Sequence, residues 1–213
     1  DIVEPSLKQY LDLVALGTVC DVVQLKGLNR AFVKEGIDVI AKKQRPGIEG
    51  LRAISNSKDI GVTELGFRIG PRINAAGRTG ASDLGFRLLT SQSDDEVMAI
   101  SERLNNLNQQ RQNIEQTVLF EATNIIEEEL VSKKLNLIPN SIVVNGEGWH
   151  LGVLGIVASR LKEKYYRPSF VVSTNEGIST GSARSVSGID VGELIIDEVN
   201  KGILNSGGGH KMA

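Results

Sequence analysis

The longest hydrophobic pattern lies in the middle of the 213-residue chain. Apolar residues recur there at three- and four-residue intervals, the period of one helix face. They are Val97, Ile100, Leu104, Leu107, Ile114, Val118 and Ile125. A capping-box sequence, Ser93 to Glu96, precedes them, so we predict one helix from about Asp94 to about Ser132, on the order of 55 to 60 Å long. Arg111 and a run of Asn and Gln interrupt the stripe. The helix is therefore either an ordinary solvated helix or a connector between two domains, and the change in composition on its two sides favours the connector.

Shorter patterns occur on both sides of this helix. Before it, the apolar, β-prone run Leu13–Val19 predicts a strand buried on both faces. The segments 29–43 and 84–89 predict helices, and Arg45–Gly47 predicts a turn.

After the long helix, the segments 141–144 and 169–173 predict strands, and residues 155–165 between them predict a helix. This order is a β-loop-α-β unit, whose helix must pack on a sheet. The patterns together predict an α/β protein in two parts.

Charge is almost balanced, with 24 basic and 26 acidic residues and a net charge of −2, which excludes a broadly basic nucleic-acid coat. The balance hides a division: residues 1–93 carry a surplus of three positive charges, residues 94–139 five negative charges, and residues 140–213 none. Near-neutrality is therefore no argument against binding DNA through a few placed arginines.

Cysteine and histidine counts exclude several kinds of site. The single cysteine, Cys20, excludes a disulfide scaffold and a thiolate zinc site, and it is compatible with the reducing cytoplasm. Only His150 and His210 are present, which excludes a His-rich metal site. No apolar run reaches the roughly 20 residues of a membrane span. Because the chain begins without Met, we expect it to be a segment of a longer protein.

Two candidate sites lie before the long helix. Asp21 follows the predicted strand 13–19, where a carboxylate can hold a hard cation, although it can equally be a helix cap or turn residue. Residues 67–78 hold Arg68, Arg72 and Arg78 with almost no acid nearby. Arginine guanidinium groups bind phosphate in a bidentate geometry, so this segment is either a phosphate-binding loop or a turn with solvated arginines.

Three further candidates follow the helix. On a strand, Ser182 and Arg184 share a face and can grip one phosphate, although Ser-rich edge strands are common. The glycines 207–209 can form an anion-binding nest beside His210, or belong to a flexible tail. Trp149 in the strand-to-helix loop is more typical of a packing anchor than of a ligand.

In their order along the chain, these motifs resemble the RecJ branch of the DHH phosphoesterase superfamily, the bacterial 5′-to-3′ exonucleases specific for single-stranded DNA. The matching stretches are 10–23, 66–78, 105–111, 146–160, 181–185 and 207–213. The resemblance implies a fold in which residues 1–92 are the later part of a parallel-sheet catalytic DHH domain. Residues 93–136 would be a long connector helix, and residues 137–213 a smaller α/β DHH-associated, DNA-binding domain, truncated at its C-terminal end.

The resemblance also implies a role for individual residues. Asp21 matches a ligand of a catalytic two-metal Mn²⁺ or Mg²⁺ site, most of whose ligands lie outside this chain. Gly208, Gly209 and His210 match the motif that faces the scissile phosphate, so Asp21 and His210 are the implied catalytic residues. The implied DNA contacts are Ser182, Arg184 and Ser185 at the 5′ phosphate, and Arg72, Asn74 and Arg78 at the backbone.

The implied activity is hydrolysis of single-stranded DNA in repair and recombination. The implied setting is the bacterial cytoplasm, with single-strand-binding protein and a helicase as further partners. Two alternatives stay open: a nucleic-acid-binding chain without activity of its own, and a phosphoesterase of the same superfamily acting on short oligonucleotides. We expect the 213-residue chain alone to be inactive.

Overall fold

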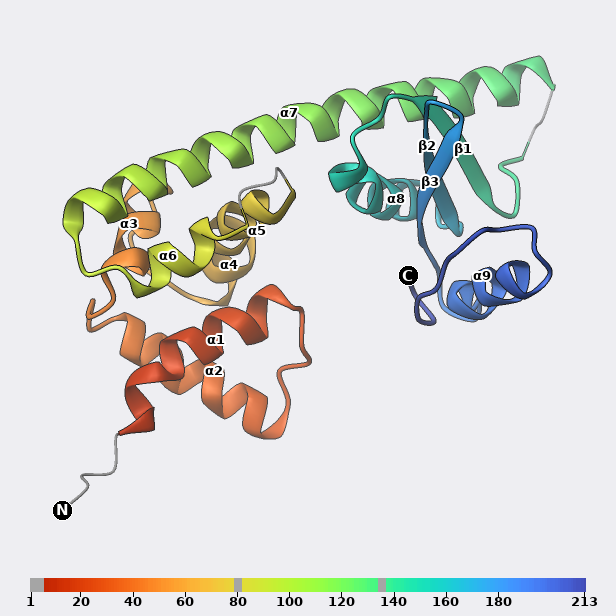
Figure 1. Cartoon of the computed structure of the whole chain (residues 1–213). Coiled ribbons are helices and arrows are strands. Elements are labelled where there is room, and N and C mark those ends of the chain that lie inside the picture. Colours follow the sequence, from red (N-terminus) through yellow and green to blue (C-terminus); the bar gives the residue numbers. More distant parts are fainter. Residues whose placement is uncertain (1–5, 79–81, 134–136) are drawn as a thin grey trace. The chain divides into compact units, whose positions relative to one another are not determined.

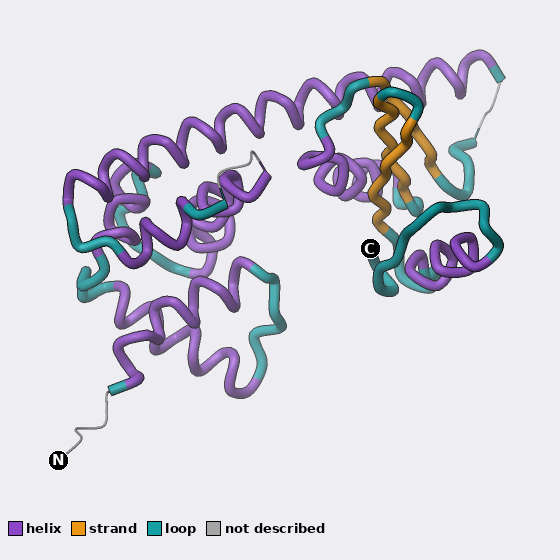
Figure 2. The backbone as a smooth tube through the Cα atoms, viewed as in Figure 1, coloured by secondary structure: helices purple, strands orange, loops and turns teal. Residues whose placement is uncertain are grey.

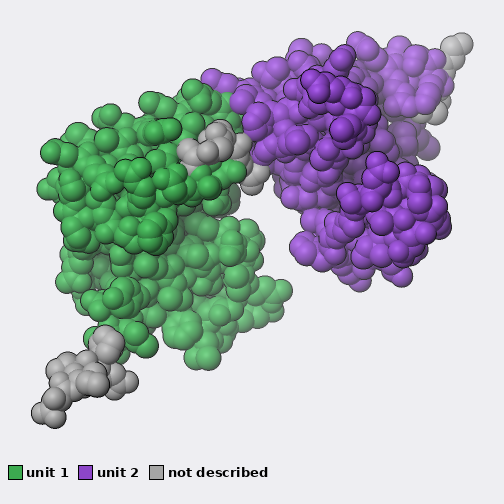
Figure 3. All heavy atoms as spheres, in the orientation of Figure 1, with its two compact units in different colours: residues 1–111 green, residues 112–213 purple. Residues whose placement is uncertain are grey.

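The computed structural model describes residues 6–78, 82–133 and 137–213 (Figure 1). Contacts divide the chain into two compact units, residues 1–111 and 112–213 (Figure 3). The described part of the first unit is helical, and the described strands all belong to the second unit (Figure 2). The mixed α/β fold class predicted from the sequence is confirmed, with helices and strands unevenly divided between the units.

The first unit contains short and medium-length helices and the beginning of the long one. Their bounds are η1 (Leu7–Tyr10), α1 (Leu11–Cys20), α2 (Gly27–Ile40), α3 (Pro46–Ile54), α4 (Val62–Glu64), the π-helix η2 (Leu65–Ile69), α5 (Gly70–Arg78), α6 (Leu84–Thr90) and α7 (Asp94–Ser132). The helices predicted over 29–43 and 84–89 are confirmed as α2 and α6.

The strand predicted over 13–19 is wrong, because these residues form helix α1, which packs along α2. Gly36 of α2 allows the close approach: a Cβ there would lie 2.2 Å from the carbonyl oxygen of Leu11 and 2.5 Å from the Cβ of Ala15. The turn predicted at Arg45–Gly47 is also wrong in part. Arg45 is the N-cap of α3 and Pro46 occupies its first turn, where proline needs no N–H partner.

The predicted long helix is confirmed as α7, which runs from Asp94 to Ser132 without a break. One half of the capping box forms, since the Glu96 N–H donates to Ser93 Oγ over 3.4 Å. In place of the other half, the Glu96 carboxylate accepts hydrogen bonds from Ser91 Oγ and Arg87 Nη2. The hydrophobic stripe serves both units: its early residues lie in the core of the first unit and its later ones in the core of the second.

The second unit is a three-stranded sheet with helices α8 (Leu151–Tyr165) and α9 (Val191–Asn200). Strands β1 (Ile142–Glu147) and β2 (Ser169–Asn175) pair in parallel across α8, which confirms the predicted β-loop-α-β unit. Strand β3 (Ile178–Arg184) pairs antiparallel with β2 and is an edge of the sheet, and α8 packs on β2 and β3. In the described ranges, no helix is long and apolar enough to cross a membrane.

Candidate nucleic-acid interface

Two of the predicted motifs line one groove of the second unit. The groove has a volume of about 470 Å³ and lies between β3 and the loop after α9. Residues 179–184 of β3 form one wall, and residues 206–208 with part of α9 form the other. The sequence segments 181–185 and 207–210 therefore meet in space, although more than 20 residues separate them in the chain.

Ser182 and Arg184 lie on the same face of β3, as predicted from strand geometry, and Arg184 Nη1 donates a hydrogen bond to Ser182 Oγ over 3.3 Å. Both residues are half-buried. Their register, opposite Val171 and Ser169 of β2, places them on the face of the sheet that α8 covers. A hydroxyl and a guanidinium held together in this way can bind two oxygens of one phosphate group.

Ser185 differs from these two neighbours because it is buried, with 1% of its surface exposed. Its hydroxyl donates to the carbonyl oxygen of Ile189 over 2.8 Å, and its N–H donates to that of Met212 over 3.0 Å. In this structure Ser185 fixes the turn after β3 and ties the last residues of the chain to it, while Ser182 and Arg184 carry the groups that a ligand can reach.

The glycine-rich loop is exposed, but it does not use its glycines for positive φ angles. Its glycines allow close packing instead: a Cβ at Gly209 would lie 2.2 Å from the carbonyl oxygen of Ala213, and one at Gly207 would lie 2.6 Å from the Ile195 side chain. A Cβ at Gly208 would meet no neighbour within 4 Å. The His210 N–H donates to Ala213, which closes the end of the loop and leaves the imidazole exposed.

Trp149 is a packing anchor, as expected from its position. The ring is 5% exposed within the second core, and its Nε1–H donates to Glu121 Oε2 of α7 over 2.7 Å. The neighbouring His150 is the N-cap of α8, and its Nδ1 accepts a hydrogen bond from the Gly152 N–H over 3.0 Å. Both residues therefore have a structural function at the start of α8.

In the first unit, the arginine-rich segment is a continuous helix rather than the predicted loop or turn. It comprises η2 and α5, and the Gly70 N–H bonds to the carbonyl oxygen of Leu65 across a π-helical turn. Pro71 follows this π-helical turn directly, as the second residue of α5. π-helical turns inside helices often occur at functional sites.

Arg72 is anchored to the long helix. Its Nε donates to Asn105 Oδ1 of α7 over 3.0 Å, and its Nη1 donates to the carbonyl oxygen of Arg68 over 2.6 Å. Burial and, to a smaller extent, the charge of Arg68 lower the pKa of Arg72, which still stays protonated at neutral pH. Asn74 is exposed, and the side chain of Arg78 lies outside the described part of the structure.

Asp21 is the C-cap of helix α1 and is exposed, so the carboxylate does not lie at the end of a strand as predicted. The preceding Cys20 packs against the arginine-rich helix, with its thiol donating to the Leu65 carbonyl oxygen over 3.8 Å. Burial, and secondarily the charge of Asp21, raise the pKa of the Cys20 thiol to about 11. The end of α1 therefore brings Asp21 to the π-helical start of the arginine-rich segment.

The ligands of a metal centre are incomplete in the residues that the structure describes. Nowhere among them do three or more His, Cys, Asp or Glu side chains gather closely enough to hold a metal ion. Asp21 offers one exposed carboxylate, and a hydrolytic metal centre needs several ligands. Asp21 can therefore serve as one ligand of a shared site, not as a site by itself.

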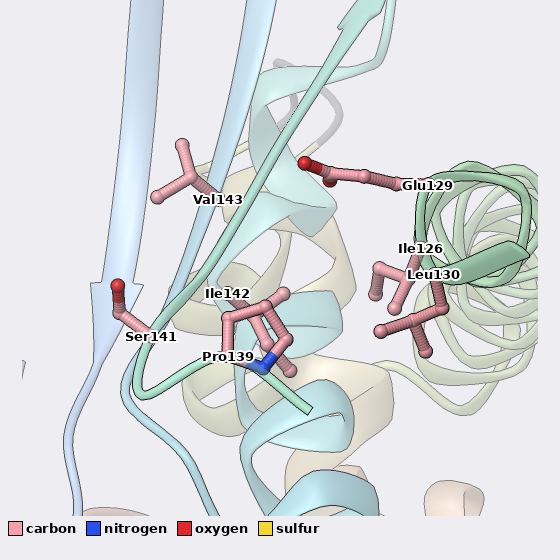
Figure 4. A pocket seen from close by; sticks show the side chains of 7 residues that line it. All are labelled: Ile126, Glu129, Leu130, Pro139, Ser141, Ile142 and Val143. Carbon is pink, nitrogen blue, oxygen red and sulfur yellow. The ribbon is translucent and has the colours of Figure 1, made fainter. Parts of the chain in front are cut away.

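A smaller hollow of about 190 Å³ lies between the end of α7 and β1 (Figure 4). It is lined mainly by apolar side chains, including Ile126, Leu130 and Val143, with Glu129 and Ser141 as its polar members. None of the candidate site residues predicted from the sequence lines it. The hollow contributes nothing to the groove between β3 and the glycine-rich loop.

Sequence reasoning missed two residues that position the candidate side chains. Asn105 accepts a hydrogen bond from Arg72, and its signals were its place beside the hydrophobic stripe of α7 and in the matching stretch 105–111. Gly155 of α8 lies against Ser182 and Arg184, and its signals were a glycine at the start of a predicted helix and its place in the matching stretch 146–160.

The chain matches known proteins along its length. Residues 136–213 match the family model of the DHHA1 domain. The single-stranded-DNA-specific exonuclease RecJ of Escherichia coli is 37% identical over 219 residues, covering 100% of this chain and 38% of that protein. RecJ of Thermus thermophilus is 36% identical over 213 residues, covering 98% of this chain and 29% of that protein.

Solved structures agree with these matches. The crystal structure of RecJ in complex with Mn²⁺ from Thermus thermophilus has a TM-score of 0.83 and 34% identity, and the match covers 98% of this chain and 30% of that one. A second structure, of exonuclease RecJ bound to manganese, has a TM-score of 0.77 and 33% identity, covering 98% of this chain and 50% of that one. The chain thus spans half or less of the length of the proteins that it matches. In sequence and in fold the chain is similar to part of the RecJ exonucleases, and residues 136–213 match the DHHA1 domain.

Proposed function

We propose that this chain is part of a metal-dependent 5′-to-3′ exonuclease that hydrolyses single-stranded DNA in repair and recombination. The observation that carries the proposal is the groove of the second unit, whose lining includes Ser182 and Arg184 of β3 together with the exposed glycines 207 and 208. The relatives that match the whole chain are single-stranded-DNA-specific exonucleases.

In this proposal, the second unit holds the end of the DNA strand. Ser182 and Arg184 bind the 5′ phosphate, and Ser185 keeps the end of β3 in place through its buried hydrogen bonds. Gly208 and Gly209 offer backbone N–H groups to the scissile phosphate, and the exposed imidazole of His210 lies beside them as a proton donor. These contacts recognise phosphate and leave the base sequence unread.

In the first unit, Arg72, Asn74 and Arg78 bind the DNA backbone, and Asp21 supplies one metal ligand. We propose residues 1–92, 93–136 and 137–213 as the catalytic part, the connector and the DNA-binding domain. Mn²⁺ or Mg²⁺ is the proposed cofactor, since RecJ of Thermus thermophilus was solved with each, and a two-metal site would take its other ligands from outside this chain. Such ions activate water and stabilise charge on the phosphate.

The proposed location is the bacterial cytoplasm. Single-stranded DNA is the main partner, with single-strand-binding protein and a helicase as further ones. A second candidate function, DNA binding without hydrolysis, is favoured for the 213-residue chain alone, because among its described residues no three His, Cys, Asp or Glu side chains gather closely enough to hold a metal ion.

The first test compares 5′-phosphorylated and 5′-hydroxyl single-stranded oligonucleotides bound to the 213-residue chain, measured by fluorescence anisotropy. Wild type should prefer the phosphorylated strand, and Arg184→Ala should lower that preference by about 10-fold or more, because a charge-assisted pair of hydrogen bonds is lost. Equal affinity of wild type for both strands would contradict the proposed role of Arg184.

The second test concerns hydrolysis. In a full-length RecJ-type protein that carries this chain, Asp21→Ala should abolish Mn²⁺-dependent degradation while leaving DNA binding intact. The chain alone should not degrade 5′-phosphorylated single-stranded DNA. Robust Mn²⁺-dependent degradation by the purified chain would show that the ligands outside it are unnecessary.

A further inference from the structure

Gly155 occupies an unusual place in the second unit. It lies inside α8, a 15-residue helix, where glycine is a poor helix former. The helix N-cap is His150, and the helix holds one other glycine, Gly152, in its first turn. A glycine at this position therefore needs a reason other than helix stability.

The reason lies on the neighbouring strand. A Cβ built on Gly155 would lie 2.9 Å from Arg184 Nη2, 3.0 Å from Ser182 Oγ and 3.4 Å from Arg184 Cζ. Carbon atoms do not approach such groups so closely without displacing them. The two side chains that Gly155 accommodates are the same two that we propose for the 5′ phosphate.

The atoms in question are the far ends of side chains, not backbone. The guanidinium of Arg184 sits on a flexible stem, and its hydrogen bond to Ser182 Oγ, at 3.3 Å, is near the upper limit for such bonds. A methyl group at residue 155 would therefore displace the guanidinium from Ser182 Oγ, at the cost of straining the bond that Arg184 Nη1 also donates to the Ala183 carbonyl oxygen over 2.6 Å. The gain in helix propensity offsets part of that cost.

We propose that Gly155 is a positioning residue for phosphate recognition: its missing side chain leaves the space in which Ser182 and Arg184 lie together. This inference rests on the proposed function, since it concerns the same pair of side chains. Gly155 itself offers no group to the ligand, and it sets the specificity for a 5′ phosphate through Arg184.

The test uses four variants of the 213-residue chain: Gly155→Ala, Arg184→Ala, the double variant, and Gly17→Ala as the control. Gly17 lies inside helix α1, and a Cβ there would meet no neighbour within 4 Å. Affinity for a 5′-phosphorylated and a 5′-hydroxyl oligonucleotide is measured by fluorescence anisotropy, and the thermal midpoint by circular dichroism.

Gly155→Ala should lower the preference for the 5′ phosphate about fivefold or more, the effect of a lost hydrogen bond to a charged group. Its affinity for the 5′-hydroxyl strand and its thermal midpoint should stay close to the wild-type values, because the gain in helix propensity offsets part of the cost. In the Arg184→Ala background, Gly155→Ala should have little further effect, since residues that act through each other are not additive. Gly17→Ala should leave the preference unchanged.

The outcomes separate the two proposals. If Arg184→Ala removes the preference and Gly155→Ala does not, the positioning role is wrong and the proposed function survives. A lower thermal midpoint for Gly155→Ala with an unchanged preference would show that Gly155 is merely structural. Equal binding of both strands by wild type would overturn the phosphate-binding role of Arg184, and the role of Gly155 with it.

Discussion

The ion pair between Arg45 and Asp12 allows a sharp test of what stabilises the first unit. Asp12 is a buried charge, with 4% of its side chain exposed, and Arg45 Nε lies 2.5 Å from its Oδ2. A second bond, from Arg45 Nη2 to Asp12 Oδ1, is 3.2 Å long. Arg45 Nη1 also donates to the carbonyl oxygen of Leu89 over 2.9 Å. The pair therefore joins α1, the start of α3 and the end of α6.

Arg45→Ala would leave the Asp12 carboxylate with one bond, from the N–H of Leu13 at 2.7 Å. Two charge-assisted hydrogen bonds would be lost, and a buried charge would have no counterion. Removing one partner of such a pair costs about 3–5 kcal/mol. This is a large share of the roughly 5–15 kcal/mol that stabilises a typical domain.

Urea unfolding followed by circular dichroism at a helix wavelength measures the loss. With a slope of about 1–3 kcal/mol per molar urea, the transition of the first unit should move down by about 1–5 M. The fluorescence of Trp149, the only tryptophan of the chain, reports the second unit and should change much less.

Arg52→Ala is the matched control. Arg52 pairs with Glu49 within α3, and both side chains are more exposed than those of Asp12 and Arg45. Exposed pairs of this kind contribute about 1 kcal/mol or less. If Arg45→Ala costs no more than Arg52→Ala, the reasoning from burial is refuted. The double replacement Asp12→Leu with Arg45→Met should regain much of the loss, because no buried charge remains.

Three further results are expected. Gly146→Ala should destabilise the second unit by about 1–3 kcal/mol, an overpacking cost, because a Cβ there would lie 2.0 Å from the rigid Trp149 ring; a thermal midpoint unchanged from wild type would contradict this. Burial raises the pKa of the Cys20 thiol to about 11, so the thiol should be protonated and react slowly with a disulfide reagent at pH 8. The reaction rate should rise toward pH 11, and half-maximal reactivity near pH 9 would contradict the raised pKa. Ser185→Ala should lower the stability of the second unit by about 1 kcal/mol, since it removes the buried hydrogen bond to the Ile189 carbonyl oxygen. The variant should keep the preference for a 5′ phosphate. Loss of that preference with unchanged stability would mean that the hydroxyl contacts the ligand.

The long helix and the β-loop-α-β unit could be predicted because both have a clear period. Seven apolar residues mark one face of α7, and the strands β1 and β2 are short apolar runs bounded by turn residues. Helix α1 could not be distinguished from a strand. The run from Leu13 to Val19 is apolar on all sides and rich in β-branched residues, and only packing against α2 through Gly36 decides its conformation.

The candidate site was predictable where it depends on neighbours along the chain. Ser182 and Arg184 share a face because strands alternate, which needs no knowledge of the fold. The contact of Arg72 with Asn105 and that of Gly155 with Arg184 join distant segments, so no local pattern shows them. The arginine-rich segment was predicted as a loop or turn because Gly70, Pro71 and Asn74 are typical of loops. In the structure a π-helical turn directly before Pro71 continues into α5, so the segment is helical.

The polar interval in α7 has a consequence for local unfolding. Between Leu107 and Ile114 the helix has no apolar side chain, although residues before and after the interval are anchored in the two cores. The side chains of this interval are polar, with Asn108 buried and its Oδ1 accepting a hydrogen bond from Arg111 Nη2 over 2.9 Å, and opening there does not require either core to separate. Hydrogen exchange should therefore be slow in the flanking turns and faster in the interval, so that one continuous helix behaves as two segments of separate stability.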